Sequence, residues 1–206
     1  YFVNSVFVSA CAVAGMLLIG SMAAYALVRM RRGEWLYAYF TVGIMIPVHA
    51  ILIPSFVLFK QLNLLNTHAG LILNYVVSNL SLAIFVLYGF MRTLPRELEE
   101  SAAIDGLGRF RTFVAIVLPL SRPGLATVGT LGFLNCWNEY LFAYVLIRSE
   151  PAKMLTQGVM ALTGQFSTDY ALLCAGLVVS IVPVWIVYLL FQEQIVKGMT
   201  AGAVKG

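Results

Sequence analysis

The chain has 206 residues, of which 61% are hydrophobic and only 11% are charged, and its formal net charge is +4. A soluble domain is about half apolar and about a quarter charged, so this composition excludes a soluble enzyme, a nucleic-acid-binding module and a disordered segment. It predicts a membrane protein, in which an excess of Lys and Arg more often sets the topology than binds an acidic ligand.

Five stretches are long and apolar enough to cross a bilayer as helices, which takes about 20 residues each. They cover about residues 2–28, 36–59, 71–91, 124–147 and 171–191. The apolar runs are continuous rather than alternating, which predicts an all-α bundle of transmembrane helices and argues against strands.

The second stretch contains Pro47, His49 and Pro54, so we expect a kink or break near its outer half. His49 has two interpretations that the sequence leaves open. It either packs at the kink with a hydrogen bond to a neighbouring helix, or serves as a proton relay or ligand.

The distribution of basic residues predicts the orientation. Ten of the 13 Lys and Arg residues fall in the first connection, the loop 92–123 and the tail 192–206, which share one side of the membrane. That side is expected to be cytoplasmic, with Tyr1 outside and the C-terminus inside. Because the span count is odd and the first apolar run begins at Tyr1 without signal-peptide features, we expect a longer protein with a further N-terminal span.

The loop 92–123 carries two predicted helices joined by a glycine. The first follows Pro95, has acids in its first turns and can end at Gly106, which adopts positive φ at low cost. The second has one apolar stripe formed by Phe110, Phe113, Val114 and Val117. By pattern alone this segment, which we call the knob, is either an ordinary interfacial loop or a docking site.

The knob resembles a known motif. Glu100-Ser101-Ala102, Gly106 and Ile116-x-Leu118-Pro119 are similar to the EAA loop of ABC importer permeases, with Ser101 as the only substitution. In that family the loop docks into a cleft of the cytoplasmic ATPase subunit and transmits its movement to the membrane helices. The resemblance therefore implies ATPase-coupling roles for Glu99, Glu100, Ser101, Ala102, Asp105, Gly106, Phe110, Ile116 and Pro119.

Three further segments look like the carbohydrate-type members of these permeases, in particular the maltose-transporter G-type subunits. They are Ala23–Leu27 with the following Arg29 and Arg32-Gly33, Trp137–Tyr140, and the C-terminal Lys197–Gly206. The resemblance implies a sugar importer in the inner membrane of a bacterial or archaeal cell. It also implies three kinds of protein partner besides membrane lipid: a second, non-identical permease, an ATPase dimer that binds ATP and Mg²⁺, and an extracytoplasmic solute-binding protein.

No catalytic constellation and no phosphate-binding loop occur in the sequence, so we expect no enzymatic activity and no cofactor in this chain. Cys11, Cys136 and Cys174 lie far apart in apolar stretches, which favours buried thiols over a metal site.

Polar residues inside the membrane stretches are the candidates for a translocation path. Asn135, Asn138 and Glu139 share a helix face by their spacing, and Asn79 gives the third stretch polar character. A charge at the bilayer centre costs about 2.5–3.5 kcal/mol, so this face must point at protein or water. The residues either bond helices together or line the path. Two other functions stay open: a stand-alone carrier or channel that uses Glu139 and His49 for protons, and an ABC permease for another solute.

The external segment 148–170 is expected to begin a short helix at Pro151, with Met154, Val159, Leu162 and Phe166 on its apolar side. It either rests on the membrane or contacts the binding protein, for which Gln157 and Gln165 are crosslinking positions. The tail 197–206 is either disordered or reaches between the ATPase subunits, as in the resembling family.

Overall fold

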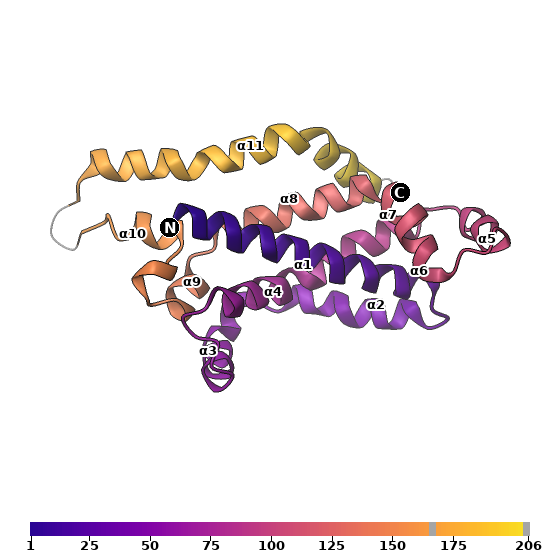
Figure 1. Cartoon of the computed structure of the whole chain (residues 1–206), viewed down its shortest axis with the longest axis horizontal. Helices are drawn as coiled ribbons and strands as arrows, with labels where there is room; N and C mark the ends of the chain where they lie inside the picture. Colours follow the sequence, from indigo (N-terminus) through magenta and orange to yellow (C-terminus); the bar gives the residue numbers. More distant parts are fainter. Residues whose placement is uncertain (165–167, 204–206) are drawn as a thin grey trace. The chain divides into compact units, whose positions relative to one another are not determined.

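The computed structural model describes the backbone of residues 1–164 and 168–203 and the side chains of residues 1–164 and 168–193. The described residues form helices joined by turns and loops and contain no strand, which confirms the predicted all-α fold (Figure 1). The α-helices are α1 Phe2–Arg29, α2 Gly33–Val42, α3 Leu52–Gln61, α4 His68–Met91, α5 Glu97–Ile104, α6 Arg109–Thr112, α7 Leu118–Leu120, α8 Arg122–Asn138, α9 Leu141–Leu146, α10 Leu155–Met160 and α11 Tyr170–Ala203.

Three described helices are long and apolar enough to cross a membrane: α1, α4 and the Tyr170–Glu193 part of α11. Two bent helix pairs raise the number to as many as five. They are Gly33–Met45 with Val48–Gln61, and Arg109–Leu120 with Arg122–Asn138, the second bent by 76°. Pro183 lies inside α11, a position that membrane helices tolerate better than soluble ones.

The second predicted span is broken where its prolines indicate. The 3-10 turn η1, Gly43–Met45, ends before Pro47, and a second 3-10 turn, η2, Val48–Ile51, leads into α3. Pro47 cannot continue a helix because its ring blocks the preceding turn. Pro54 falls in the first turn of α3, where a missing N–H costs nothing.

Two predicted helices have different bounds in the structure. The helix expected over 124–147 is divided, because α8 ends at Asn138 and α9 begins at Leu141. The helix expected to begin at Pro151 begins at Leu155 instead, since Pro151 lies in a separate 3-10 turn, η4, Glu150–Ala152. Gln165 and Phe166, which the same prediction used, lie outside the described residues.

The chain forms two compact units, each assembled from several segments. The first unit comprises Tyr1–Gly15, Ile46–Asn79 and Leu131–Leu190. The second comprises Met16–Met45, Leu80–Thr130 and the described residues from Phe191 onward.

The first unit has an apolar core to which α1, α3, α4, α8 and α9 contribute. Its fully buried members include Val8, Leu71, Phe142, Ala143 and Ile147. Gly15 allows α1 to approach α4 closely, because a Cβ there would lie 3.1 Å from Val76 Cγ2. Close packing of this kind replaces the hydrophobic driving force that helices lack in lipid.

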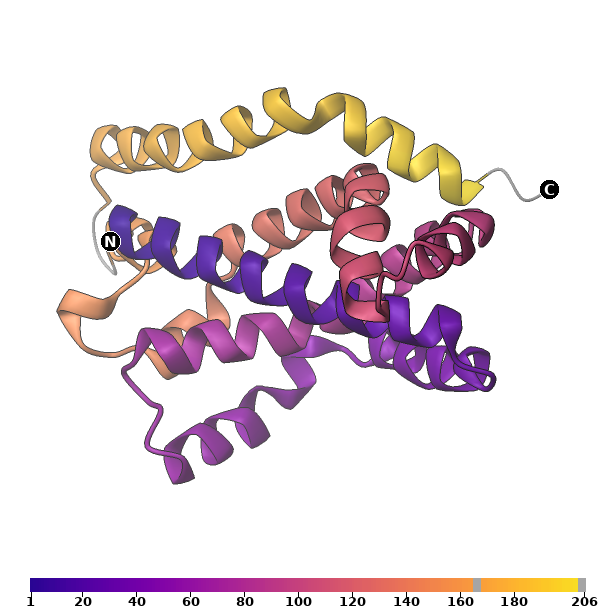
Figure 2. The same cartoon turned by 45° about the vertical axis from the view of Figure 1, so that its right-hand side comes forward.

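Side-chain to backbone hydrogen bonds hold the loops of the first unit. Asn4 Nδ2 donates to the carbonyls of Pro151 at 2.8 Å and Lys153 at 3.0 Å, and Leu155 N donates to Ser5 Oγ at 2.8 Å. These bonds place α10 beside the N-terminal end of α1 (Figure 2). Asn66, at φ 59°, accepts from Arg148 N at 2.6 Å and from Ser149 N at 3.2 Å.

The second unit packs the remaining part of α1 against α4. A Cβ on Gly20 would lie 3.0 Å from that of Ala83, so the two helices meet through small residues. Tyr37 of α2 stacks on Tyr88 of α4 with ring centroids 3.9 Å apart. Phe113 and Val117 are buried in this unit, and Tyr25 stacks on Phe113 at 5.1 Å.

Candidate functional site

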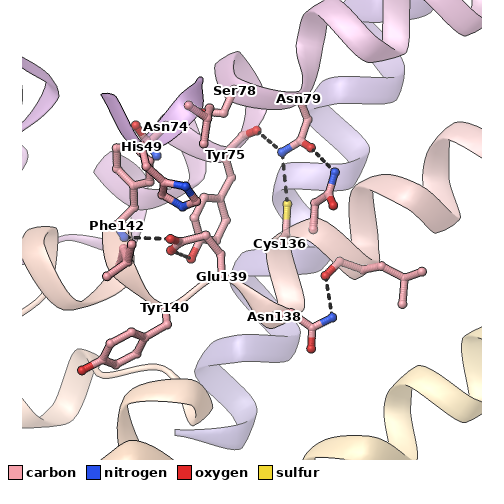
Figure 3. Close-up of a pocket in the computed structure, with 14 residues that line it drawn as sticks. His49, Asn74, Tyr75, Ser78, Asn79, Cys136, Asn138, Glu139, Tyr140 and Phe142 are labelled. Atoms are coloured by element: carbon pink, nitrogen blue, oxygen red, sulfur yellow. Dashed lines mark hydrogen bonds between the residues drawn. The ribbon is translucent and has the colours of Figure 1, made fainter. Parts of the chain in front are cut away.

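A polar hollow of about 590 Å³ lies within the first unit, at the level where α8 ends. Four elements and the break at Glu139-Tyr140 provide its walls (Figure 3). The lining side chains come from α4 (Asn74, Tyr75, Ser78, Asn79), from the end of α8 (Leu134, Asn135, Cys136, Asn138), from the break (Glu139, Tyr140), from η2 (Val48, His49) and from α9 (Leu141, Phe142). All four residues predicted for a translocation path therefore lie around one cavity.

The residues on α4 face the hollow because of their spacing. Asn74 and Ser78 are four residues apart, as are Tyr75 and Asn79, so both pairs lie on one face of the helix. The path predicted from the sequence included Asn79 but neither Asn74 nor Tyr75. The same i, i+4 spacing could have identified them, whereas Tyr140 and Phe142 depend on a break that no periodicity indicated.

The Glu139 carboxylate explains why the chain breaks there. Its Oε1 accepts from Phe142 N at 2.8 Å, and its Oε2 accepts from Ala143 N at 3.0 Å and from the Tyr75 hydroxyl at 3.0 Å. The carboxylate thus caps the N-terminus of α9, where backbone N–H groups have no partner in the helix and a negative charge is favoured. Glu139 is an anchor of the cavity wall.

The asparagines form a hydrogen-bonded chain across the cavity. Asn135 Nδ2 donates to Asn79 Oδ1 at 2.9 Å, and Asn79 Nδ2 donates to the Tyr75 carbonyl at 2.9 Å. Asn138 Nδ2 donates to the Leu134 carbonyl at 2.9 Å. The Asn135–Asn79 bond joins α8 to α4, and the bonds of Asn79 and Asn138 to carbonyls of their own helices fix the orientation of those amides.

Asn74 differs from its neighbours. Its side chain is only 5% exposed, and its Nδ2 has no hydrogen-bond partner in the described residues. A buried donor without a partner costs free energy unless a ligand or water accepts from it. Asn74 therefore places a buried amide without a partner in the cavity wall.

His49 packs against an aromatic ring in this wall. Its imidazole stacks on Phe142 with centroids 6.2 Å apart and an interplanar angle of 26°. The described residues contain no group of three His, Cys, Asp or Glu side chains that could hold a metal ion. The cavity instead offers amides, hydroxyls and aromatic side chains, which together suit a polyhydroxylated solute.

The knob lies in the second unit and has the predicted helix–glycine–helix order. Helix α5 ends at Ile104, Asp105 is its C-cap, and Gly106 has φ 81°, a conformation that favours glycine. Helix α6 then leads into a π-helical turn, η3, Phe113–Val117, before α7.

The knob's acids are placed differently from one another. Glu99 lies inward with its side chain 16% exposed, pairs with Arg29 through both Nη2 and Nε, and accepts from the Tyr25 hydroxyl at 3.0 Å. Glu100 and Asp105 are exposed. Glu99 consequently connects the knob to α1 in the same unit, and the other two acids are free to meet a partner.

The expected apolar stripe is only partly buried. Phe113 and Val117, at the two ends of the π-helical turn, are buried, whereas Phe110 and Val114 are exposed. Of the other predicted coupling residues, Ala102 is buried, Ile116 is half-buried, and Ser101 and Pro119 are exposed. Exposed apolar side chains of the knob are Leu98, Ile104 at 87%, Phe110 at 69% and Val114.

Comparisons with known proteins agree with this fold and with the motifs. The family described as binding-protein-dependent transport system inner membrane component matches residues 16–200. That range covers most of the chain, and the chain belongs to this family. It is a multi-pass membrane component of an importer and is not the subunit that hydrolyses ATP, as the resemblance of the knob implied.

Two relatives and one solved structure are similar over nearly the whole chain. The permease protein of a diacetylchitobiose uptake system from Streptomyces coelicolor is 38% identical over 206 residues, 98% of this chain and 68% of the relative. The permease protein of a sulfoquinovosyl glycerol transport system from Agrobacterium fabrum is also 38% identical, over 98% of this chain and 72% of the relative.

The crystal structure of a bacterial ABC transporter involved in import of the acidic polysaccharide alginate has the same fold. It matches with a TM-score of 0.81 at 24% identity, over 93% of this chain and 73% of that chain. The carbohydrate-type resemblance identified from the sequence is confirmed by these relatives, whose names are those of sugar permeases.

Proposed function

We propose that this chain is the transmembrane subunit of an ATP-driven sugar importer and forms the translocation path with a second, non-identical permease. Two ATPase subunits, which bind ATP and Mg²⁺, dock on the cytoplasmic side, and an extracytoplasmic solute-binding protein delivers the sugar. The pair of permeases then alternates between outward-open and inward-open states. The membrane is the inner membrane of a bacterial or archaeal cell, with Tyr1 outside and the C-terminus in the cytoplasm.

The observation that carries the proposal is the cavity with the unused donor of Asn74. Sugars present hydroxyl groups to amides and apolar ring faces to aromatic side chains, and the lining supplies the exposed amide of Asn138 and the half-buried ring of Tyr140. An amino acid carries a carboxylate and an ammonium group. The single ionic group of the lining, Glu139, already accepts three hydrogen bonds, so it is poorly suited to pair with that ammonium group.

The knob supports the coupling part of the proposal. The exposed Ile104 lies four residues after the exposed Glu100 on α5, so the two share one face of that helix and place an apolar patch beside an acid. Exposed apolar patches rimmed by polar residues mark interaction sites, and this one suits docking into a cleft of an ATPase. Mutagenesis can test two parts of this proposal. One is the coupling contact of the knob, and the other is the translocation path through Asn79, Asn135, Asn138 and Glu139.

The external segment is proposed to contact the binding protein, but Gln157 is the wrong position for a crosslink. Its side chain is buried, accepts from Met154 N at 3.0 Å and donates to the Ile147 carbonyl at 2.9 Å. Met160, which is exposed on α10, is a better crosslinking position. The proposed contact of the C-terminal tail with the ATPase dimer lies outside the described side chains.

The test uses the complex purified through a tag on this chain and reconstituted in nanodiscs. We expect ATP hydrolysis to rise several-fold when the binding protein is loaded with one member of a panel of neutral oligosaccharides. Stimulation by an amino acid or a metal ion, with no response to any sugar in the panel, would contradict the sugar assignment. A transport-competent preparation that contains no ATPase subunit would contradict the coupling.

A further inference from the structure

A second hollow, of about 400 Å³, lies in the other unit, where α1 and α4 end and α2 begins. Four arginines and one glutamate are among the side chains around it. Its lining consists of Leu27, Val28, Arg29, Met30, Arg31, Glu34, Tyr88, Arg92, Leu94 and Arg96.

Two of the four arginines have acidic partners and two do not. Arg29 pairs with Glu99, and Arg92 Nη2 lies 3.1 Å from Glu34 Oε1. Arg31 and Arg96 form no ion pair with any residue that the structure describes. The hollow therefore has two positive charges without an internal counter-ion, and both arginines are exposed.

The hollow lies at the level where membrane helices leave the bilayer. Between Phe2 and Val28 helix α1 is uncharged, and α4 carries no Asp, Glu, Lys or Arg before it ends at Met91. On α2, Trp35 and Tyr39 are four residues apart and are 77% and 69% exposed. Exposed Trp and Tyr at the end of spans mark the headgroup layer, so the arginines meet this layer rather than bulk water.

We propose that this hollow binds the phosphate group of an anionic phospholipid, with Arg31 and Arg96 as its direct ligands. A guanidinium fork matches a phosphate oxygen pair in geometry as well as in charge. Glu99 and Glu34 hold Arg29 and Arg92 in place beside them. Leu27, Val28 and Leu94 supply an apolar wall for the glycerol and upper acyl chain, which free phosphate does not have. The proposal requires only that the chain spans a membrane and is independent of the sugar assignment.

The test measures lipid binding to the complex purified through this chain, by native mass spectrometry during titration with phosphatidylglycerol or phosphatidylcholine. The test variant carries Arg31→Gln and Arg96→Gln. The control carries Arg32→Gln and Arg111→Gln, which removes the same charge from two exposed arginines outside the hollow. We expect the wild type and the control to prefer phosphatidylglycerol, and the test variant to bind it about tenfold or more weakly.

Another variant and a competition experiment distinguish a bound phospholipid from free phosphate and from an effect on ATPase binding. A variant with Arg31→Lys and Arg96→Lys keeps the charge but loses the fork, so we expect intermediate binding. Equal phosphatidylglycerol binding by wild type and test variant overturns the proposal, as does an equal loss in the control. Displacement of the lipid by millimolar inorganic phosphate assigns the site to free phosphate and also overturns it. The proposal is also overturned if the ATPase subunits dissociate from the test variant while its lipid binding is unchanged.

Discussion

Glu139 shows how a membrane protein can keep a carboxylate within a cavity wall at modest cost. Three donors meet its two oxygens, and two of them are backbone N–H groups that a helix start would otherwise leave unpaired. Fixed hydrogen bonds from the protein thus take the place of the water that would otherwise hydrate the carboxylate. This arrangement favours a structural role over proton transfer, which would require the carboxylate to release those donors.

Substitution of Glu139 separates the two roles. Glu139→Gln keeps one oxygen that can accept from the N-terminus of α9 but loses the other acceptor, so we expect a smaller loss of stability than in the alanine variant, and transport near wild type. Glu139→Ala removes the cap and should lower the free energy of unfolding by about 1–2 kcal/mol, with loss of transport. Thermal unfolding and uptake, both in nanodiscs or liposomes, measure these effects. Complete loss of transport in a stably folded Gln variant would instead support a proton-carrying role.

Asn74 and Asn79 are five residues apart on α4, and their substitutions have opposite expected effects. Asn74→Ala removes an unpartnered buried amide, so the free energy of unfolding should not fall. The sugar concentration that gives half-maximal ATPase stimulation should rise by about 2- to 12-fold, because one hydrogen bond to the solute is lost. Asn79→Ala breaks the bonds to Tyr75 and Asn135 and should destabilise the protein by about 1–2 kcal/mol. Melting curves and ATPase titrations of both variants make the comparison. A destabilised Asn74→Ala variant with unchanged sugar response would show that the amide is structural.

At the scale of elements, the ion pair between Glu99 and Arg29 connects the knob to α1. Both side chains are largely buried, and the Tyr25 hydroxyl adds a third contact. We expect Glu99→Gln to destabilise the second unit by about 1.5–3 kcal/mol, because a charge-assisted network loses its anion. Glu100→Gln, on the adjacent exposed residue, should leave stability unchanged and weaken ATPase binding. Differential scanning fluorimetry and co-purification distinguish the two variants, and identical behaviour of both would contradict this division of roles.

The turn of the knob offers a matched pair of glycines. A Cβ on either Gly106 or Gly108 would meet nothing within 4 Å, yet only Gly106 has positive φ, at 81°. Gly106→Val should therefore strain the turn by about 1–2 kcal/mol and uncouple ATP hydrolysis from transport, while Gly108→Val should behave like wild type. The measurement is the ratio of sugar transported to ATP hydrolysed. Full coupling in the Gly106→Val variant would refute the coupling role of the turn.

Elements with a periodic pattern were predictable, and elements set by a single contact were not. Apolar runs predicted the helices, and Pro47 predicted a break because a proline acts locally. The break after Asn138 depends on the Glu139 side chain reaching Phe142 and Ala143, which is a capping geometry with no periodic signal. The π-helical turn at Phe113–Val117 also escaped prediction, because an ideal helical period assumes 3.6 residues per turn.

At the scale of the whole molecule, the motif around the knob and the composition together were enough to predict the family. The four polar residues predicted for a translocation path do line one cavity, because three of them lie within one helical turn and the fourth bonds to one of them. The sequence could not show which hydrogen-bond or ion-pair partner each polar group has. Asn74 is recognisable as an unused donor, and Glu99 as an inward-facing acid, only once their neighbours in space are known.

The central claim is that this chain carries sugar across a membrane at the expense of ATP hydrolysed by partner subunits. The most direct measurement is uptake of a labelled neutral oligosaccharide into proteoliposomes that contain the complex purified through this chain, with its binding protein outside. The account predicts uptake that requires ATP inside and the binding protein outside, and that persists when the proton gradient is collapsed. Uptake that needs a proton gradient and continues without ATP would contradict it.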